Sequence, residues 1–218
     1  MKIKGAIFDM DGTLVDSLML WEVLWDSFAE RFCGGESFRP SAEDDKAVRT
    51  MLLRDAMRLI HEHYGFGKNG GELLDTANAI FADFYTNRVE LKAGVRGFLE
   101  HLFASGVKMC LASATAPELL SLALKHCELE KYFLKVFSCG ELGLGKDKPD
   151  IYLLAKDLLE TPLEETWIFE DSHVALKTAA SIGMPTVGIW DKHNTNQDDI
   201  KAIATHYVAE GETLLKLI

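Results

Sequence analysis

An apolar run followed at once by acidic residues opens the chain. Gly5–Phe8 is an uninterrupted apolar stretch, which predicts a buried strand. Asp9 and Asp11 follow it, and Gly12 then permits a sharp turn before Thr13. A lone Asp-x-Asp could simply form a turn that closes the strand. Two carboxylates this close repel each other, however, so a bound cation or a shared proton is the other interpretation.

The next part of the chain changes to a helical period. Apolar residues recur every three or four positions over residues 21–32, 42–64 and 74–85, which predicts three amphipathic helices. A glycine-rich segment, residues 65–71, separates the second helix from the third. Because no strand pattern appears between these helices, we expect residues 18–91 to form a separate helical domain.

Strands and helices alternate in the remainder of the chain. Strands are predicted at 107–112, 134–138, 167–169 and 186–190, with helical patterns between them. This alternation predicts an α/β fold in which a Rossmann-like parallel sheet has helices on both faces. We expect residues 1–17 and 92–218 to form this core domain. Thr115 and Glu118 resemble a capping box that starts the helix after the second strand.

Polar side chains follow several of the predicted strands. Ser113 follows one strand, Lys146 lies in a loop after another, and Glu170 and Asp171 follow a third. Each has a simpler explanation, as a helix cap, a solvated loop charge or an acidic turn. Parallel sheets bind ligands beyond the carboxyl ends of their strands, where all of these residues are predicted. A shared pocket therefore explains them better than separate coincidences.

Composition narrows the choice of ligand and compartment. The chain has 218 residues with 48% apolar content, which suits a globular protein with a sizeable core. Its net charge of −11 argues against nucleic acid and anionic membrane as partners. Its four cysteines have no metal-binding spacing, and no apolar stretch is long enough to span a bilayer. We therefore expect a cytoplasmic protein with reduced thiols.

The acidic residues at the strand ends suit phosphoryl chemistry. Four carboxyl groups favour a hard cation with oxygen ligands, of which Mg²⁺ commonly also binds substrate phosphate. A lysine and a hydroxyl on the opposite side could hold the remaining phosphate oxygens. One aspartate could attack phosphorus, and a second carboxyl group could protonate the leaving oxygen and later deprotonate water.

Four motifs match a known family in that family's own order. Residues 9–17 resemble the first motif of the haloacid dehalogenase superfamily, and Ser113 matches the second. Residues 146–152 are similar to the Lys-x-x-Pro-Asp third motif, and residues 169–184 resemble the fourth. The resemblance extends over the whole chain, which is similar to beta-phosphoglucomutase and phosphoglycolate phosphatase-type hydrolases. In that branch a helical cap, here residues 18–91, is inserted after the first motif.

The resemblance implies a role for each site residue. Asp9 would be the nucleophile and a metal ligand, and Asp11 the general acid and base whose backbone carbonyl also binds the metal. Asp171 would bind Mg²⁺, with Glu170 as a further ligand or as a partner of one. The residues expected to hold the substrate phosphate are Thr13, Ser113, Ala114 and Lys146. The second lysine of the loop, Lys148, lacks the family's spacing.

The expected function is a magnesium-dependent phosphatase that hydrolyses a small phosphorylated metabolite through an aspartyl-phosphate intermediate. A sugar-phosphate mutase is the first alternative, because such relatives share all four motifs. Those mutases carry a histidine in the helix after the first motif, where this chain has Trp21. Indole cannot titrate or accept a hydrogen bond. We therefore expect net hydrolysis.

A signalling module that binds a metal or accepts a phosphoryl group without catalysis is an alternative of another class. Receiver domains combine similar residues, but their lysine comes last along the chain. Here Lys146 precedes the final acidic pair. A relative that had lost catalysis would be expected to lack Asp9 or Asp11, and both are present. For the assembly we expect a monomer, with a dimer as the alternative.

Overall fold

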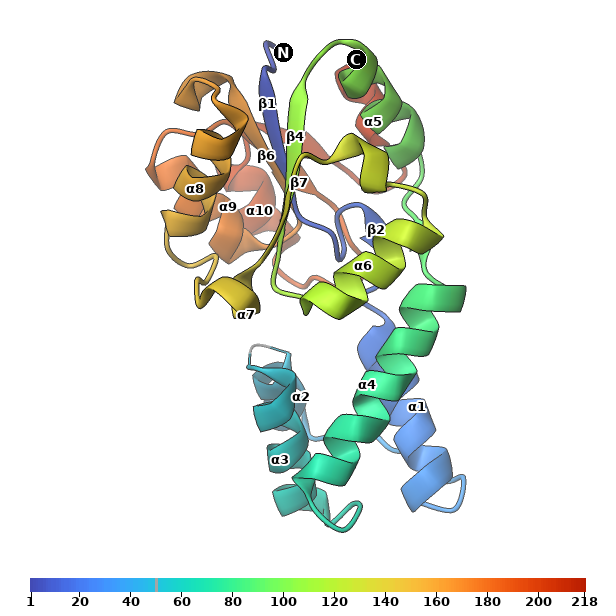
Figure 1. Cartoon of the computed structure of the whole chain (residues 1–218). Coiled ribbons are helices and arrows are strands. Elements are labelled where there is room, and N and C mark those ends of the chain that lie inside the picture. The colour runs from blue at the N-terminus through green and yellow to red at the C-terminus, as the bar shows by residue number, and fades with distance from the viewer. Residues whose placement is uncertain (50) are drawn as a thin grey trace. The chain divides into compact units, whose positions relative to one another are not determined.

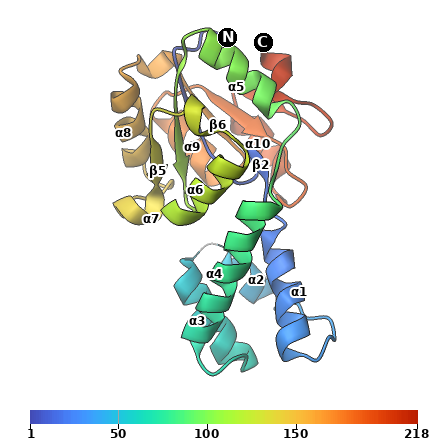
Figure 2. The same cartoon turned by 45° about the vertical axis from the view of Figure 1, so that its right-hand side comes forward.

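The computed structural model of the protein describes residues 1–49 and 51–218, which divide into two compact units. The α/β unit contains Met1–Leu18 and Val89–Ile218, and the helical unit is Met19–Arg88. Figures 1 and 2 show the elements of each unit from two directions. The chain leaves the α/β unit after β2 (Val15–Asp16) and re-enters it at β3 (Glu90–Leu91).

The α/β unit is built on a six-stranded sheet with the order β5-β4-β1-β6-β7-β8. All neighbouring strands run parallel. Its strands are β1 (Gly5–Phe8), β4 (Lys108–Ser113), β5 (Val136–Ser138), β6 (Thr166–Glu170), β7 (Thr186–Ile189) and β8 (His206–Val208). The predicted α/β class with a Rossmann-like parallel sheet is confirmed. All four residues of β1 are buried, as expected for a central strand covered on both faces.

Helices connect the strands and lie on both sides of the sheet (Figure 1). They are α5 (Val95–Ala104), α6 (Pro117–His126), α7 (Cys139–Leu142), α8 (Asp150–Leu159), α9 (His173–Ser181) and α10 (Gln197–Ile203), with short 3₁₀ helices at Glu130–Tyr132, Leu163–Glu165 and Leu214–Leu217. Ile7 of β1 packs in a cluster with α8 and α9 residues such as Ala155 and Ala179. The next residue, Phe8, stacks on Phe169 and meets Phe98 of α5 edge-on. Because successive side chains of a strand point to opposite faces, β1 contributes to the core on both sides of the sheet.

The two strands that flank the helical unit along the chain, β2 and β3, form a small antiparallel pair. β2 and β3 pair through Val15 with Leu91 and Asp16 with Glu90. The backbone N–H of Lys92 also donates to the carbonyl oxygen of Leu14 at 2.9 Å. The entry and the exit of the helical unit are therefore held next to each other.

The described residues of the helical unit form four helices, which are α1 (Leu20–Phe32), α2 (Ala42–Val48), α3 (Leu53–Tyr64) and α4 (Gly70–Asn87). The single helix predicted over residues 42–64 is wrong, because α2 and α3 are separate. Leu52, which lies within the predicted helix, has extended backbone angles and is 60% exposed. Thr50, which lies in the predicted helix, is outside the described residues. The glycine-rich break is also shorter than predicted, since Asn69 caps α4 and Gly70 already belongs to that helix.

Aromatic and polar contacts combine inside the helical unit. Trp25 is fully buried and donates its indole N–H to Asp45 Oδ1 at 3.1 Å. The guanidinium of Arg49 pairs with Asp45 at 2.8 Å and with Glu22 at 2.9 Å, and it lies over the Trp21 ring. These contacts tie α1 to α2. Among the described residues, no helix is long and apolar enough to cross a membrane.

Candidate active site

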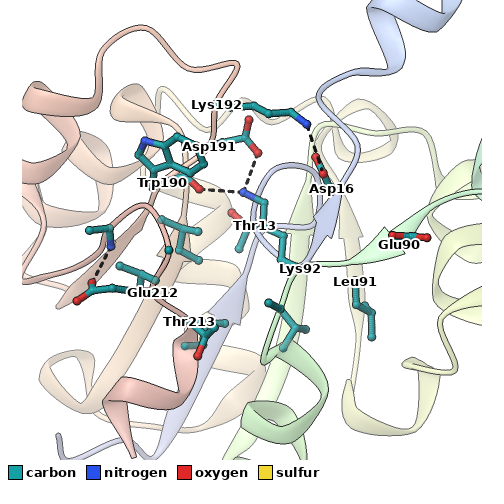
Figure 3. A pocket seen from close by; sticks show the side chains of 17 residues that line it. Thr13, Asp16, Glu90, Leu91, Lys92, Trp190, Asp191, Lys192, Glu212 and Thr213 are labelled. Atoms are coloured by element: carbon teal, nitrogen blue, oxygen red, sulfur yellow. Dashed lines mark hydrogen bonds and ion pairs between the residues drawn. The ribbon is translucent and has the colours of Figure 1, made fainter.

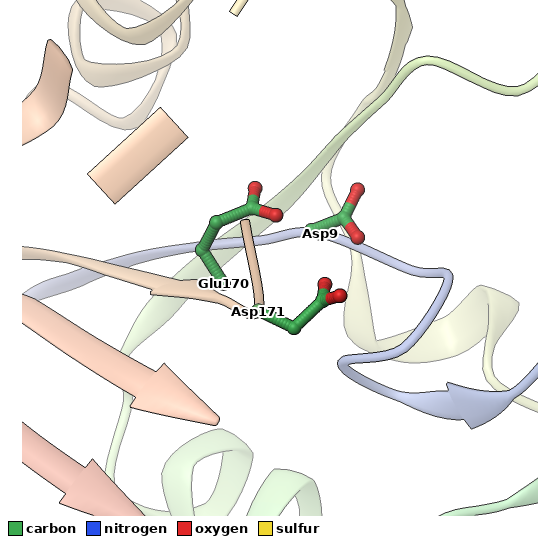
Figure 4. Close-up of side chains that lie close together, drawn as sticks. All are labelled: Asp9, Glu170 and Asp171. Atoms are coloured by element: carbon green, nitrogen blue, oxygen red, sulfur yellow. The ribbon is translucent and has the colours of Figure 1, made fainter. Parts of the chain in front are cut away.

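Two neighbouring strands bring three carboxyl groups together. Asp9 follows β1, and Glu170 and Asp171 stand at the end of β6. Because β1 and β6 pair in register, the Asp9 N–H donates to the carbonyl oxygen of Phe169 at 2.9 Å. One carboxylate oxygen from each acid lies within 4.8 Å of the other two, and all three side chains are buried. Figure 4 shows the three carboxyl groups pointing toward one another.

Lys146 supplies positive charge to this acidic cluster. It lies in the loop between α7 and α8, and its ammonium donates to Asp9 Oδ1 and to Glu170 Oε2, the latter at 2.7 Å. The Lys146 side chain is 13% exposed. Lys148, the other lysine of the loop, is exposed. Lys146, which the motif spacing favours, is thus the lysine that contacts the acids.

Burial and charge shift the pKa values of the cluster. Burial and the negative charge of Glu170 raise the pKa of Asp9 well above its usual range, although Lys146 opposes the shift. The same two causes raise the pKa of Asp171 to about 7. Burial alone would lower the pKa of Lys146, but its acidic neighbours outweigh burial and raise it. The site therefore contains more carboxylate than its own lysine neutralises, which is a common property of functional sites.

Asp11 is not one of the three grouped acids, and its carboxylate oxygens have other partners. Its Oδ1 accepts a hydrogen bond from Ser17 Oγ and its Oδ2 one from Thr115 Oγ1, each at 2.6 Å. The predicted capping box at Thr115 is wrong, because Ala116 is the N-cap of α6 and receives no side-chain cap. Thr115 is therefore a site residue that the sequence interpretation assigned to a different role. Its position two residues after Ser113, at the end of the same strand, was the feature of the sequence that could have indicated this role.

A glycine lets the turn after Asp9 approach the acidic cluster. Gly12 has φ +77°, and a Cβ there would lie 2.5 Å from Asp171 Oδ2. Both the backbone conformation and the space exclude a side chain. The next residue, Thr13, is fully buried and donates its hydroxyl to Asp171 Oδ1 at 3.1 Å. Its side chain therefore contacts Asp171, whereas the sequence interpretation assigned it to phosphate.

Ser113 and Ala114 lie at the end of β4, the strand beside β1. Ser113 is buried, and its hydroxyl oxygen accepts the Thr115 N–H at 3.1 Å. Ala114 is exposed. Both residues thus lie on the same edge of the sheet as Asp9, in agreement with the predicted topology. Their roles as phosphate ligands stay predictions.

A residue that no motif indicated also contacts the cluster. Asn194, in the loop after β7, donates its side-chain amide to Asp171 Oδ2 at 2.7 Å and to the Asp171 backbone oxygen at 3.0 Å. The segment Asp191–Asn196 is polar throughout, so the sequence does not distinguish Asn194 from its neighbours.

The donor set fits a hard cation. Three carboxylates with no histidine or cysteine among them match the oxygen ligands of Mg²⁺. Burial and the charge of Glu170 raise the pKa values of Asp9 and Asp171, and a bound cation would oppose both effects. Asp9, Glu170 and Asp171 are thus the side chains that could hold the metal, with the backbone carbonyl of Asp11 as a predicted fourth ligand.

Comparison with known proteins gives the family. The family model of haloacid dehalogenase-like hydrolases matches residues 3–183. A phosphorylated carbohydrates phosphatase of Thermotoga maritima is 25% identical over 214 residues, which are 97% of this chain and 97% of that protein. Hexitol phosphatase A of Escherichia coli is 24% identical over 193 residues, covering 87% of this chain and 84% of that protein.

A solved structure supports the fold independently. CbbY from Rhodobacter sphaeroides, crystallised with phosphate, matches with a TM-score of 0.75 and 19% identity over 94% of this chain and 93% of that one. The predicted class of a phosphoric monoester hydrolase agrees with the family and with the names of the two curated relatives. The chain belongs to the haloacid dehalogenase-like hydrolase family.

Proposed function

We propose that the protein is a magnesium-dependent phosphatase that hydrolyses a small phosphorylated metabolite. The observation that carries this proposal is the buried cluster of Asp9, Glu170 and Asp171 around the ammonium of Lys146. A lysine ammonium and a metal ion held by carboxylates together form a good binding site for a phosphoryl group. The similar proteins named for phosphorylated carbohydrates and hexitol phosphates support this substrate class.

In the first step, an Asp9 carboxylate oxygen attacks the phosphorus of the ester, and the bond from phosphorus to the ester oxygen breaks. The alcohol oxygen takes a proton from the Asp11 carboxyl group as it leaves. The product is an aspartyl phosphate on Asp9 together with the free alcohol. The Lys146 ammonium, which has three N–H donors, is proposed to contact the phosphoryl oxygens and balance their charge.

In the second step, the Asp11 carboxylate takes a proton from water, and the water oxygen attacks phosphorus. The bond from phosphorus to Asp9 breaks, which releases inorganic phosphate and regenerates both carboxyl groups. Ser17 and Thr115 hold Asp11 through both carboxylate oxygens in this structure. Each carboxylate oxygen keeps a second lone pair, which is available for the proton exchanged with the leaving alcohol or with water.

A bound Mg²⁺ would neutralise phosphoryl charge beside Asp9. We assign its side-chain ligands to Asp9, Asp171 and Glu170. Ser113 and Ala114 are proposed to bind the remaining phosphate oxygens through a hydroxyl and a backbone N–H.

The helical unit is proposed to act as a cap that selects the substrate. Its Trp21 occupies the position where related mutases carry a histidine, and the indole packs against Trp25 and Phe81. An indole provides no titratable control over Asp11, which favours transfer of the phosphoryl group to water rather than to a second sugar. The four cysteines are free, which is compatible with a cytoplasmic enzyme.

The test is a panel of phosphorylated sugars, sugar alcohols and other small metabolites, assayed for phosphate release with Mg²⁺ and with excess EDTA. We expect release from at least one compound, and its loss on chelation. Hexose 1-phosphate with catalytic bisphosphate should yield inorganic phosphate rather than the 6-phosphate. Turnover that survives complete chelation would overturn the metal dependence, and efficient isomerisation without phosphate release would favour the mutase.

A further inference from the structure

The Asn194 amide holds the carboxyl group of Asp171 from outside the acidic cluster. It donates to Oδ2 at 2.7 Å and to the backbone oxygen at 3.0 Å, while Thr13 donates to Oδ1 at 3.1 Å. Each carboxylate oxygen of Asp171 thus accepts a hydrogen bond, and the Asn194 amide nitrogen also donates to the Asp171 backbone oxygen. Such contacts fix the direction of a carboxylate as well as its position.

The loop that carries Asn194 is held in place by its own hydrogen bonds. The Gln197 amide donates to the backbone oxygens of Asp191 at 2.7 Å and of Asn194 at 3.3 Å. Its side-chain oxygen accepts the Tyr207 hydroxyl at 2.8 Å. The backbone N–H of His193 donates to Asp191 Oδ1 at 2.9 Å. Asn194 therefore contacts Asp171 from a loop whose conformation is held by hydrogen bonds.

A buried ion pair anchors the start of the loop. Asp191 is 2% exposed and pairs with Lys92 at 2.7 Å, and the same ammonium donates to the backbone oxygen of Trp190 at 3.0 Å. Figure 3 shows Lys92 reaching both groups at the edge of a pocket of about 330 Å³. Lys92 directly follows β3, so the loop is fixed to the main body of the α/β unit.

We propose that Asn194 is a positioning residue that orients the Asp171 carboxylate for a divalent cation. The inference rests on the proposed magnesium-dependent function. An amide suits this task because it donates hydrogen bonds without bringing a charge that would compete with the cation for the carboxylate. A lysine at the same place would satisfy Asp171 but would repel the metal.

Outer partners of metal ligands affect the affinity for the metal, and their loss typically weakens binding by about 10- to 100-fold. Asn194→Ala removes both amide contacts with Asp171. The same loop offers a matched control in Asn196, which is exposed. Asn196→Ala therefore removes an asparagine side chain from the loop without touching the cluster.

The experiment measures Mg²⁺ affinity by calorimetry for the wild-type protein and both variants, without substrate. We expect about a tenfold or greater loss of affinity for Asn194→Ala and no more than a twofold change for Asn196→Ala. Thermal denaturation of the metal-free proteins accompanies the titration. Equal Mg²⁺ affinity in the wild-type protein and Asn194→Ala would overturn the inference.

Activity gives a second readout that separates positioning from general damage. For Asn194→Ala the Mg²⁺ concentration at half-maximal rate should rise about tenfold, and saturating Mg²⁺ should restore most of kcat. A lower kcat that saturating Mg²⁺ does not restore would overturn the inference. If the wild-type protein binds Mg²⁺ but hydrolyses no phosphate ester, the proposed function fails while the affinity result still decides the role of Asn194.

Discussion

Each unit of the molecule places one cation between two carboxylates, yet the surroundings differ. Arg49 of the helical unit pairs with Asp45 and Glu22, and all three side chains are partly exposed. Lys146 of the α/β unit pairs with Asp9 and Glu170, which are buried beside a third acid, Asp171. Water can stabilise the charges of the first cluster but not those of the second.

This difference separates a structural ion cluster from a functional one. Asp45 accepts hydrogen bonds from both Arg49 and the Trp25 indole, so this cluster ties α1 to α2. In the Lys146 cluster the pKa values of Asp9 and Asp171 are raised, which costs stability that the fold must supply elsewhere. Removing an acid should therefore raise the stability of the metal-free protein at the Lys146 cluster and lower its stability at the Arg49 cluster.

The strongest contrast comes from Asp9→Asn. We expect activity to fall at least about a thousandfold, because the amide cannot act as the nucleophile. The metal-free variant should also resist urea better than the wild-type protein at pH 8, since a buried carboxyl group no longer has to ionise. Phosphate release and urea denaturation measure the two effects. Asp157→Asn, which alters an exposed acid of the same unit, should change neither. Wild-type turnover in Asp9→Asn would refute its assignment.

Lys146→Ala should reduce kcat/KM about a hundredfold, or roughly 3 kcal/mol, because a charge-assisted contact to the reacting phosphoryl group is lost. Lys148→Ala is the matched control, since that side chain is exposed in the same loop. It should stay within about twofold of the wild-type rate. Steady-state kinetics on one substrate decides the ranking, and a larger loss in Lys148→Ala would reverse our choice of lysine.

The pH dependence of metal-free stability tests the cost of the acidic cluster. Burial raises the pKa of Asp171 to about 7, whereas an unfolded aspartate titrates near pH 4. Between these values the folded protein binds more protons, so the free energy of unfolding falls as pH rises through this window. We expect a loss on the order of 2 kcal/mol between pH 5 and pH 8. Mg²⁺ at pH 8 should restore much of it.

Urea denaturation of Asp171→Asn provides the control for this pH effect. The amide does not titrate, so the variant should lose a large part of the slope between pH 5 and pH 8. A slope equal to that of the wild-type protein would show that Asp171 is not the group responsible.

The smallest effect is expected in the helical unit. Asp45→Ala leaves the buried Trp25 N–H without its acceptor and removes the contacts of Arg49 with Asp45. We expect a loss of about 1 kcal/mol in stability, measured by thermal denaturation. Asp26→Ala, which breaks an exposed pair with Arg39, should cost much less. Greater stability of Asp45→Ala would contradict the structural role of this cluster.

The sequence was sufficient for the sheet and for the carboxylates of Asp9, Glu170 and Asp171. Their positions follow from local apolar runs and from the rule that parallel strands end at one edge. It was not sufficient for Thr115 and Asn194, whose partners lie far away along the chain. A polar residue in a loop has many possible partners, and only the folded arrangement selects one.

The separation of α2 from α3 was missed for a different reason. Leu52 fits the helical period of its neighbours, but its backbone is extended and its side chain lies mostly in solvent. Periodicity indicates which residues could share a face, and it does not show whether the backbone continues between them. The buried face of α3 is formed by Ala56, Met57 and Ile60, whereas Leu52 precedes this helix.

The pairing of β2 with β3 makes the helical unit an insertion that begins and ends at one place in the α/β unit. The chain leaves and re-enters the α/β unit at adjacent strands, about 5 Å apart as in any sheet. A short turn could therefore join Asp16 to Glu90 without rethreading the sheet. The junction thus allows one insert to replace another while the residues proposed for chemistry stay in place. With the substrate-selecting role proposed for the helical unit, recombination at this junction would change substrate preference independently of the acidic cluster.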